Sequence, residues 1–259
     1  MIDLTALSAS GHPALALILA LVTGFACSAQ SLEPLNAKLR RYVLFSGEYR
    51  VRWEGFSGRG FRPENDDHYL LNRYRLNLEL RPVPNLTLFA QAQDARVFWN
   101  TRVGDVPPLQ DRLDLRLAFV RVGNPDKSRL AAQVGRQEIR LGEERLLGTG
   151  NWANSARSFD AVRLYWNPAA HARFEIFAAA VAQQTEDAFN RRADGDNIHA
   201  VIGHLQFPGT LWEPFGLWRL SPRVRSESGR LGKQDIRTYG LRLAGSAGKQ
   251  NTYVSEMAY

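Results

Sequence analysis

Arginine recurs at every second residue of several short segments that also carry glutamate. Segment 47–54 (GEYRVRWE) contains Arg50 and Arg52, and segment 73–81 (RYRLNLELR) repeats the same spacing. A guanidinium group stays charged at any physiological pH and binds a carboxylate through two parallel hydrogen bonds. These side chains could therefore guide carboxylate ligands, or they could pair with glutamate on a neighbouring strand and fill a wet interior. The residues alone leave both interpretations open.

The elements that position these arginines are predicted to be β-strands. In segment 47–54, Tyr49, Val51 and Trp53 share one face while the charged residues share the other. Such alternation with a period of two residues is typical of a strand with two different faces. About eleven strands are predicted, some more weakly than others: 47–54, 73–81, 86–97, 112–121, 130–140, 160–166, 173–182, 197–206, 214–220, 237–243 and 252–259.

The connections between these segments alternate between long and short. The short connections are 81–85, 123–129, 167–172, 207–213 and 246–251. The long connections are 55–69, 98–111, 141–158, 183–196 and 221–235. A transmembrane β-barrel sorts its connections in this way, because short turns face the periplasm and long loops face outside. The pattern predicts an all-β fold, a transmembrane antiparallel up-and-down β-barrel.

The N-terminal residues predict export. Residues 13–26 (PALALILALVTGFA) form an apolar run of the length found in signal peptides, and small residues follow it. We expect a signal peptide over 1–29, cleaved after Ala29 or Ser28, and a barrel domain over 30–259. Lipidation of Cys27, the only cysteine, is an alternative, although the residues before it fit a lipidation motif poorly.

Composition excludes several other classes of protein. The mature chain contains no apolar run of about 18 residues, so it is not expected to cross a membrane as a helix. The formal net charge of +7 comes mostly from arginines that are spread along the chain, which disfavours nucleic-acid binding. The histidines do not show the spacing of metal ligands, and no catalytic motif is present, so we expect no enzyme activity, metal or cofactor.

The alternating strands predict which side chains line the interior of the barrel. The apolar face would contact lipid, and Trp53, Trp99, Trp166 and Trp212 lie near strand ends, where membrane barrels carry aromatic girdles. The charged face would line a lumen that is rich in arginine, which favours the passage of anions. The arginines expected there from strand parity are Arg50, Arg52, Arg73, Arg75, Arg116, Arg163 and Arg242.

The middle of the chain resembles a known family. Residues 91–99 (QAQDARVFW), 133–148 (QVGRQEIRLGEERLLG) and 151–166 (NWANSARSFDAVRLYW) resemble, in this order, the alginate-export family of outer-membrane porins from Gram-negative bacteria. The resemblance spans roughly 41–259. It implies a monomeric eighteen-stranded barrel with an arginine-rich constriction, located in the outer membrane.

The same resemblance adds two arginines to the expected ion pathway. Arg136 lies in its Gly-Arg-Gln motif and Arg157 in its Ala-Arg-x-Phe-Asp motif. Arg157 shares parity with Arg163, which suits an inward position. Arg136 would point outward unless a bulge at Gly135 reversed it, and glycine inside a strand often marks a bulge.

These observations lead to one functional expectation and one alternative. We expect a channel that passes an acidic polysaccharide or smaller carboxylates, contacts outer-membrane lipid, and receives a polymer from a periplasmic secretion partner. About eleven strands are fewer than eighteen, so we expect a chain that lacks the C-terminal third of the barrel, or else a barrel that closes with ten or twelve strands. The alternative function is a secreted, soluble β-sheet protein that binds polysaccharide.

Overall fold

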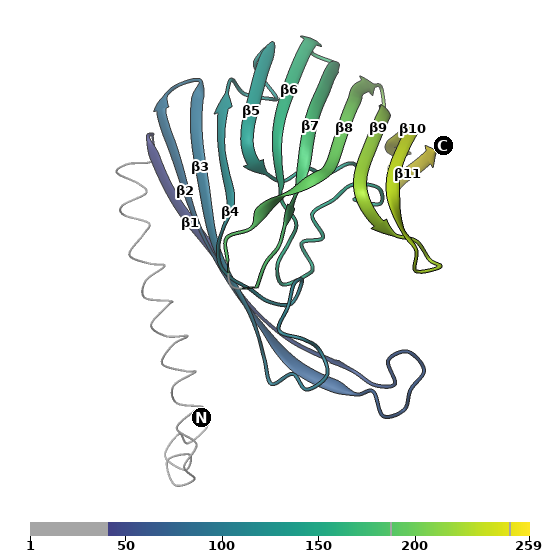
Figure 1. The fold of residues 1–259 in the computed structure, drawn as a ribbon. Helices are drawn as coiled ribbons and strands as arrows, with labels where there is room; N and C mark the ends of the chain where they lie inside the picture. The colour runs from purple at the N-terminus through teal and green to yellow at the C-terminus, as the bar shows by residue number, and fades with distance from the viewer. Residues whose placement is uncertain (1–40, 187, 249) are drawn as a thin grey trace, which may run out of the picture.

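The computed structural model describes residues 41–186, 188–248 and 250–259, which form one curved antiparallel sheet (Figure 1). The predicted signal peptide and Cys27 lie outside these residues. Eleven strands follow one another in sequence order, each paired with its neighbour in the chain. They are β1 (Val43–Phe56), β2 (Asp67–Val83), β3 (Leu86–Phe98), β4 (Asp111–Val122), β5 (Leu130–Gln137), β6 (Phe159–Ala169), β7 (Ala172–Gln183), β8 (Arg191–Phe207), β9 (Thr210–Arg225), β10 (Leu231–Ala247) and β11 (Asn251–Ala258).

This topology confirms the predicted all-β, up-and-down fold. Each predicted strand has a counterpart, although several strands extend into the segments expected to be loops, and the predicted strand 130–140 ends earlier, at Gln137. Strands β8 and β10 have 17 residues each, whereas about 9–11 residues suffice to cross a bilayer. The predicted long connections 183–196 and 221–235 accordingly shrink to 184–190 and 226–230. Among the described residues, no helix is long and apolar enough to span a membrane.

Long and short connections are sorted to opposite edges of the sheet. The connections 57–66, 99–110 and 138–158 lie at the edge drawn lowest in Figure 1, together with the two shorter ones that close β7–β8 and β9–β10. The turns at 84–85 and 208–209 lie at the opposite edge. Every connection at the first edge is longer than its neighbours at the second, as the sequence predicts.

The two faces of the sheet differ in chemistry. On β1, Tyr49, Val51 and Trp53 are exposed on the convex side, whereas Arg50 and Arg52 turn toward the concave side and are partly covered. The same alternation continues on β6 and β7, where outward Val162, Leu164 and Ile176 are about half exposed. The outward face is therefore a broad, mostly apolar surface, and the concave face holds most of the charged groups of the strands.

A bulge on β4 changes the predicted parity of that strand. Gln91 pairs with Leu117 and Ala92 pairs with Leu115, so Arg116 is the extra residue between them. A bulge of this kind shifts the residues that follow it to the other face. Leu117 is therefore buried on the concave side with Arg116, whereas strict alternation along 112–121 would place it outward with Leu115.

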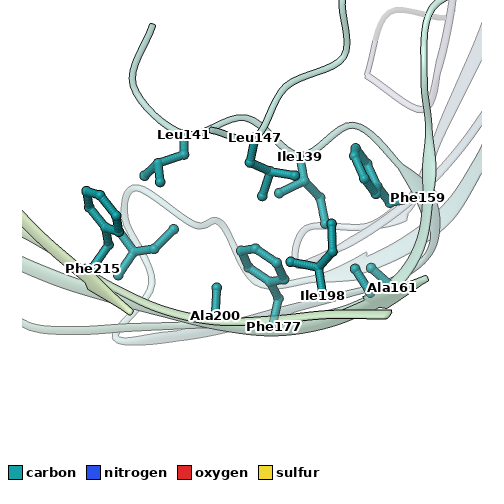
Figure 2. Close-up of a cluster of buried hydrophobic side chains, with 11 residues drawn as sticks. Ile139, Leu141, Leu147, Phe159, Ala161, Phe177, Ile198, Ala200 and Phe215 are labelled. Atoms are coloured by element: carbon teal, nitrogen blue, oxygen red, sulfur yellow. The ribbon is translucent and has the colours of Figure 1, made fainter. Parts of the chain in front are cut away.

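The longest connection, residues 138–158, folds back over the concave face of the sheet, and we call it the inner loop. Its residues Ile139, Leu141 and Leu147 pack against side chains that rise from the sheet (Figure 2). The members of this apolar cluster on the sheet are Phe159, Ala161, Phe177, Ala179, Ile198, Ala200, Ile202 and Phe215. Because these side chains are buried and pack against one another, the cluster fixes the inner loop over β6–β9.

The sheet does not close on itself. Within the described residues, β1 pairs only with β2, and β11 pairs only with β10. The alternative of a closed ten- or twelve-stranded barrel is thus not what these eleven strands form. The curvature is that of part of a larger barrel wall, with its charged face inside (Figure 1).

Candidate anion pathway

Inward arginines of β1 and β2 converge on one short stretch of the inner loop. Arg50 donates hydrogen bonds to the carbonyl oxygens of Asn151 at 3.1 Å and Ala153 at 2.8 Å. Arg73 reaches the same two carbonyl oxygens at 3.3 and 3.1 Å. Arg75 donates to the side-chain oxygen of Asn151 at 2.8 Å. The guanidinium groups of two neighbouring strands therefore hold the loop through neutral oxygen atoms.

Carboxylates neutralise part of this cationic surface. Glu48 on β1 forms a salt bridge with Arg73, and its second oxygen lies 3.7 Å from Arg75. Arg52 contacts Glu54 at 2.6 Å. The ladder of paired charges considered from the sequence is therefore present on β1 and β2. It does not satisfy Arg50, which makes no salt bridge among the described residues.

The far side of the inner loop is held by charged groups on β4, β6 and β10. Arg242 on β10 forms a salt bridge with Glu213 of β9 and another, at 2.9 Å, with Glu143 of the inner loop. Arg163 on β6 pairs with Glu175 at 2.6 Å and donates to the Glu138 carbonyl oxygen at 3.2 Å. Seven inward arginines predicted from strand parity thus surround one loop, and each is engaged by it or by a carboxylate.

Glu138 begins the inner loop directly after the last residue of β5. It forms salt bridges with Arg116 and, at 2.6 Å, with Arg140. Burial raises the pKa of the Glu138 carboxyl group, but the charges and hydrogen bonds of the two arginines outweigh burial and hold the pKa below its ordinary value of 4.5. Glu138 is therefore ionised at neutral pH and ties the start of the loop to the wall.

This lowered pKa predicts how the loop responds to acid. A carboxyl group whose pKa is lower in the folded state contributes stability above its ordinary pKa, and this contribution is lost as the pH falls through the lowered value. We expect channel current noise to stay constant from neutral pH to about 4.5 and to rise below it as Glu138 is protonated. Planar-bilayer recordings measure this. Glu138→Gln should be noisy already at neutral pH, and a quiet Glu138→Gln channel would contradict the assignment.

Arg136, which the family resemblance placed on the ion pathway, lies on the outward face. Its Nε and Nη2 atoms donate to the two carboxylate oxygens of Asp160 at 2.8 and 2.9 Å. Its Nη1 atom donates to the carbonyl oxygen of Asn190 at 2.9 Å. The structure therefore separates Arg136 from the inward arginines and gives it a role in joining β5, β6 and the 184–190 connection.

The bulge expected at Gly135 is absent, which explains this position. Gly135 pairs with Phe119 of β4 and with Ala161 of β6 in an unbroken register. The glycine instead permits a close approach, since it has a φ angle of 119° and a Cβ atom there would lie 2.3 Å from the Ala118 carbonyl oxygen. Without a bulge, Arg136 keeps the outward parity of Val134.

Arg157 lies near the end of the inner loop rather than on a strand. Its side chain is exposed, and its backbone nitrogen donates to the Thr149 carbonyl oxygen at 2.8 Å. Its own carbonyl oxygen accepts a weak hydrogen bond of 3.4 Å from Arg116. Arg157 is thus brought to the same loop as the inward arginines, at the edge of the sheet that carries the long connections.

Asn151 and Asn154 of the inner loop belong to the site but were missed from the sequence. The side-chain amide of the buried Asn154 lies 2.9–3.1 Å from the carbonyl oxygens of Asn72, Arg96 and Leu109. These contacts seat the loop against β2 and β3. The run Asn-Trp-Ala-Asn at 151–154 was part of the motif that suggested the family, but nothing in its spacing shows that it folds inward.

A comparison with known protein families identifies the family to which this chain belongs. The family described as alginate export matches residues 41–259, the whole of the sheet and its loops. The chain belongs to the alginate-export family. The resemblance seen in the sequence is therefore confirmed. No curated protein matches this alginate-export family member.

Proposed function

We propose that the chain forms the wall of an outer-membrane channel for anionic solutes, and that its substrate is an alginate-type acidic polysaccharide or smaller carboxylates. The observation that carries this proposal is the convergence of seven inward arginines on one loop. Their guanidinium groups lie on β1, β2, β4, β6 and β10 and most are buried under the inner loop, so a carboxylate on the concave side reaches them by displacing oxygen atoms of the loop. A series of such sites suits the stepwise movement of a polyanion.

The outward face supports a membrane location. Large apolar side chains such as Trp53, Leu76, Leu164 and Trp166 are 47–65% exposed on the convex side. A soluble protein rarely exposes so continuous an apolar surface, whereas a barrel in lipid requires one. Together with the predicted signal peptide, this surface favours the outer membrane of a Gram-negative bacterium over a secreted, soluble polysaccharide-binding protein.

The proposed mechanism is an exchange of ligands on the arginines. Arg50 and Arg73 bind the carbonyl oxygens of Asn151 and Ala153 in the resting arrangement. A carboxylate carries a negative charge and accepts two parallel hydrogen bonds from one guanidinium group, which a single carbonyl oxygen cannot do. A substrate carboxylate can therefore replace a carbonyl oxygen, release part of the inner loop and move to the next arginine. No covalent step is involved, and we propose no enzyme activity and no cofactor.

The export of a polymer also requires delivery to the inner mouth of the channel. The short turns 84–85, 170–171 and 208–209 form the edge that would face the periplasm. We propose that a periplasmic secretion partner meets the channel at this edge.

The reversal potential of the complete gene product in a planar bilayer under a potassium chloride gradient tests the proposed function. We expect a potential near the chloride limit, because the inward arginines remain charged at every relevant pH. Replacing Arg73, Arg75 and Arg163 together with glutamine should move the potential toward zero. A cation-selective or unselective wild-type channel would contradict anion transport and would indicate that the inward carboxylates neutralise the wall.

A further inference from the structure

A cavity lies where three of the long connections meet. The inner loop contacts the 99–110 connection through a hydrogen bond of 2.9 Å from the Ser155 nitrogen to the Pro108 carbonyl oxygen. It contacts the 184–190 connection through Gln184, whose side chain donates to the Ala156 carbonyl oxygen at 3.0 Å. The cavity between them has a volume of about 560 Å³. Its lining includes Pro107, Pro108, Glu144, Arg145, Leu146, Thr149, Ser155, Arg157 and Gln184.

The two arginines of this cavity differ from those of the strands. Arg145 and Arg157 are exposed, and within the described residues neither guanidinium group has a hydrogen bond or a salt bridge. The inward arginines of β1, β2, β4, β6 and β10 are instead engaged by the inner loop or by carboxylates. Arg145 and Arg157 can therefore accept an anion without first losing a partner.

The remaining polar groups leave the cavity with a positive balance. Glu144 also lines it, but its carboxylate accepts hydrogen bonds from the backbone nitrogens of Thr149 at 2.8 Å and Gly150 at 3.2 Å. The side chain of Ser155 is 1% exposed, and its hydroxyl oxygen has no hydrogen-bond partner within the described residues. A buried hydroxyl group without a partner costs free energy, and a ligand that supplies a hydrogen bond would recover it.

We propose that this cavity binds the terminal uronate residues of an acidic oligosaccharide at the outer mouth of the channel. Arg145 and Arg157 bind sugar carboxylates through paired hydrogen bonds, and Ser155 binds a sugar hydroxyl group. Pro107, Pro108 and Leu146 offer apolar surface to the sugar ring. The volume lies within the usual range for ligand pockets, about 300–1,000 Å³. This inference rests on the proposed transport function and assigns it a separate site outside the inward arginines.

Isothermal titration calorimetry with an alginate trisaccharide tests this site on the complete, detergent-solubilised gene product. The variant Arg145→Gln/Arg157→Gln should bind the trisaccharide at least about tenfold more weakly than the wild type, because it loses two charge-assisted interactions. The matched control is Arg62→Gln/Arg230→Gln, which removes the same charge from two exposed residues of other outer connections. This control should bind the trisaccharide with the same affinity as the wild type, and none of the proteins should bind neutral maltotriose.

The possible results separate this inference from the proposed function. The proposed binding site would be wrong if the Arg145→Gln/Arg157→Gln variant bound the trisaccharide with wild-type affinity. It would also be wrong if an anion-selective wild-type channel did not bind the trisaccharide. Neither result would contradict the proposed transport function. An equal loss of affinity in the control variant would also overturn the proposed binding site, because general surface charge would then explain binding. A wild-type channel without anion selectivity would instead remove the proposed function itself.

Discussion

Replacing Arg73 with alanine is expected to raise the single-channel conductance of the complete protein several-fold. Arg73 is 1% exposed and joins Glu48 of β1 to the carbonyl oxygens of Asn151 and Ala153. Its removal leaves a carboxylate without its main partner and two carbonyl oxygens with one donor fewer. Glu48 is 40% exposed, so water compensates part of the lost ion pair, but hydrogen bonds that involve a charged group contribute about 1.5–3 kcal/mol each, enough to loosen this side of the inner loop. The loosened part of the loop would then fill less of the concave face.

Planar-bilayer recordings of three variants measure this effect. Arg73→Lys keeps the charge but loses the planar fork, so its conductance should lie between those of the wild type and Arg73→Ala. Arg81→Ala is the control, because Arg81 forms a similar salt bridge with Glu79 at 2.6 Å but lies near a short turn and is half exposed. An unchanged conductance in Arg73→Ala would show that the inner loop does not set the width of the pathway.

The inward arginines of β1 and β2 were predictable from the sequence because alternation is a local property. Tyr49, Val51 and Trp53 on one face fix the position of Arg50 and Arg52 on the other, and the register of β1 with β2 contains no bulge that would change this relation. The same holds for the order of the strands, since short turns force consecutive strands to pair. The wall of the site therefore follows from the residues almost directly.

The prediction of which face a residue occupies was wrong where the strand register depends on a neighbouring strand. The bulge at Arg116 arises in the pairing of β4 with β3, and nothing in the β4 sequence marks it. At Gly135 the expectation was reversed, because the glycine accommodates the Ala118 carbonyl oxygen and the strand runs through without a bulge. A glycine in a strand can mark a bulge or a close contact with the backbone of the neighbouring strand, and the partner strand decides which of the two occurs.

The inner loop was also beyond sequence reasoning, although its residues carry the necessary chemistry. Leu141 and Leu147 lie in a segment too short and too irregular to show a periodic pattern, and Ile139 was assigned to the predicted strand 130–140, which ends at Gln137. Their burial depends on Phe177 and Phe215, which lie on strands that come later in the chain. A long connection of a barrel can extend outward or fold inward, and this choice depends on surfaces that exist only after the sheet has formed.

The apolar cluster is the second attachment of the inner loop, and Phe177→Ala is expected to weaken it strongly. Phe177 is 3% exposed beneath Ile139 and Leu147 (Figure 2), and large-to-small substitutions of a buried phenylalanine cost about 3–5 kcal/mol. We expect this loss in the free energy of unfolding in guanidinium, measured in lipid vesicles. Ile176→Ala is the matched control, because Ile176 is the preceding residue on β7, points outward and is 51% exposed. A loss in Phe177→Ala no larger than that in Ile176→Ala would mean that the cluster does not fix the loop.

The double variant Arg73→Ala/Phe177→Ala then tests whether both attachments hold one rigid loop. Either single change leaves the loop tethered at its other side, so the concave face stays partly filled. Losing both should raise the conductance by more than the product of the two single effects, because residues linked through a shared segment are energetically coupled. If the conductance increase of the double variant instead equals the product of the two single increases, the two halves of the inner loop move independently. The arginines would then control only the half that contains Asn151, and passage past Phe177 would be governed by packing alone.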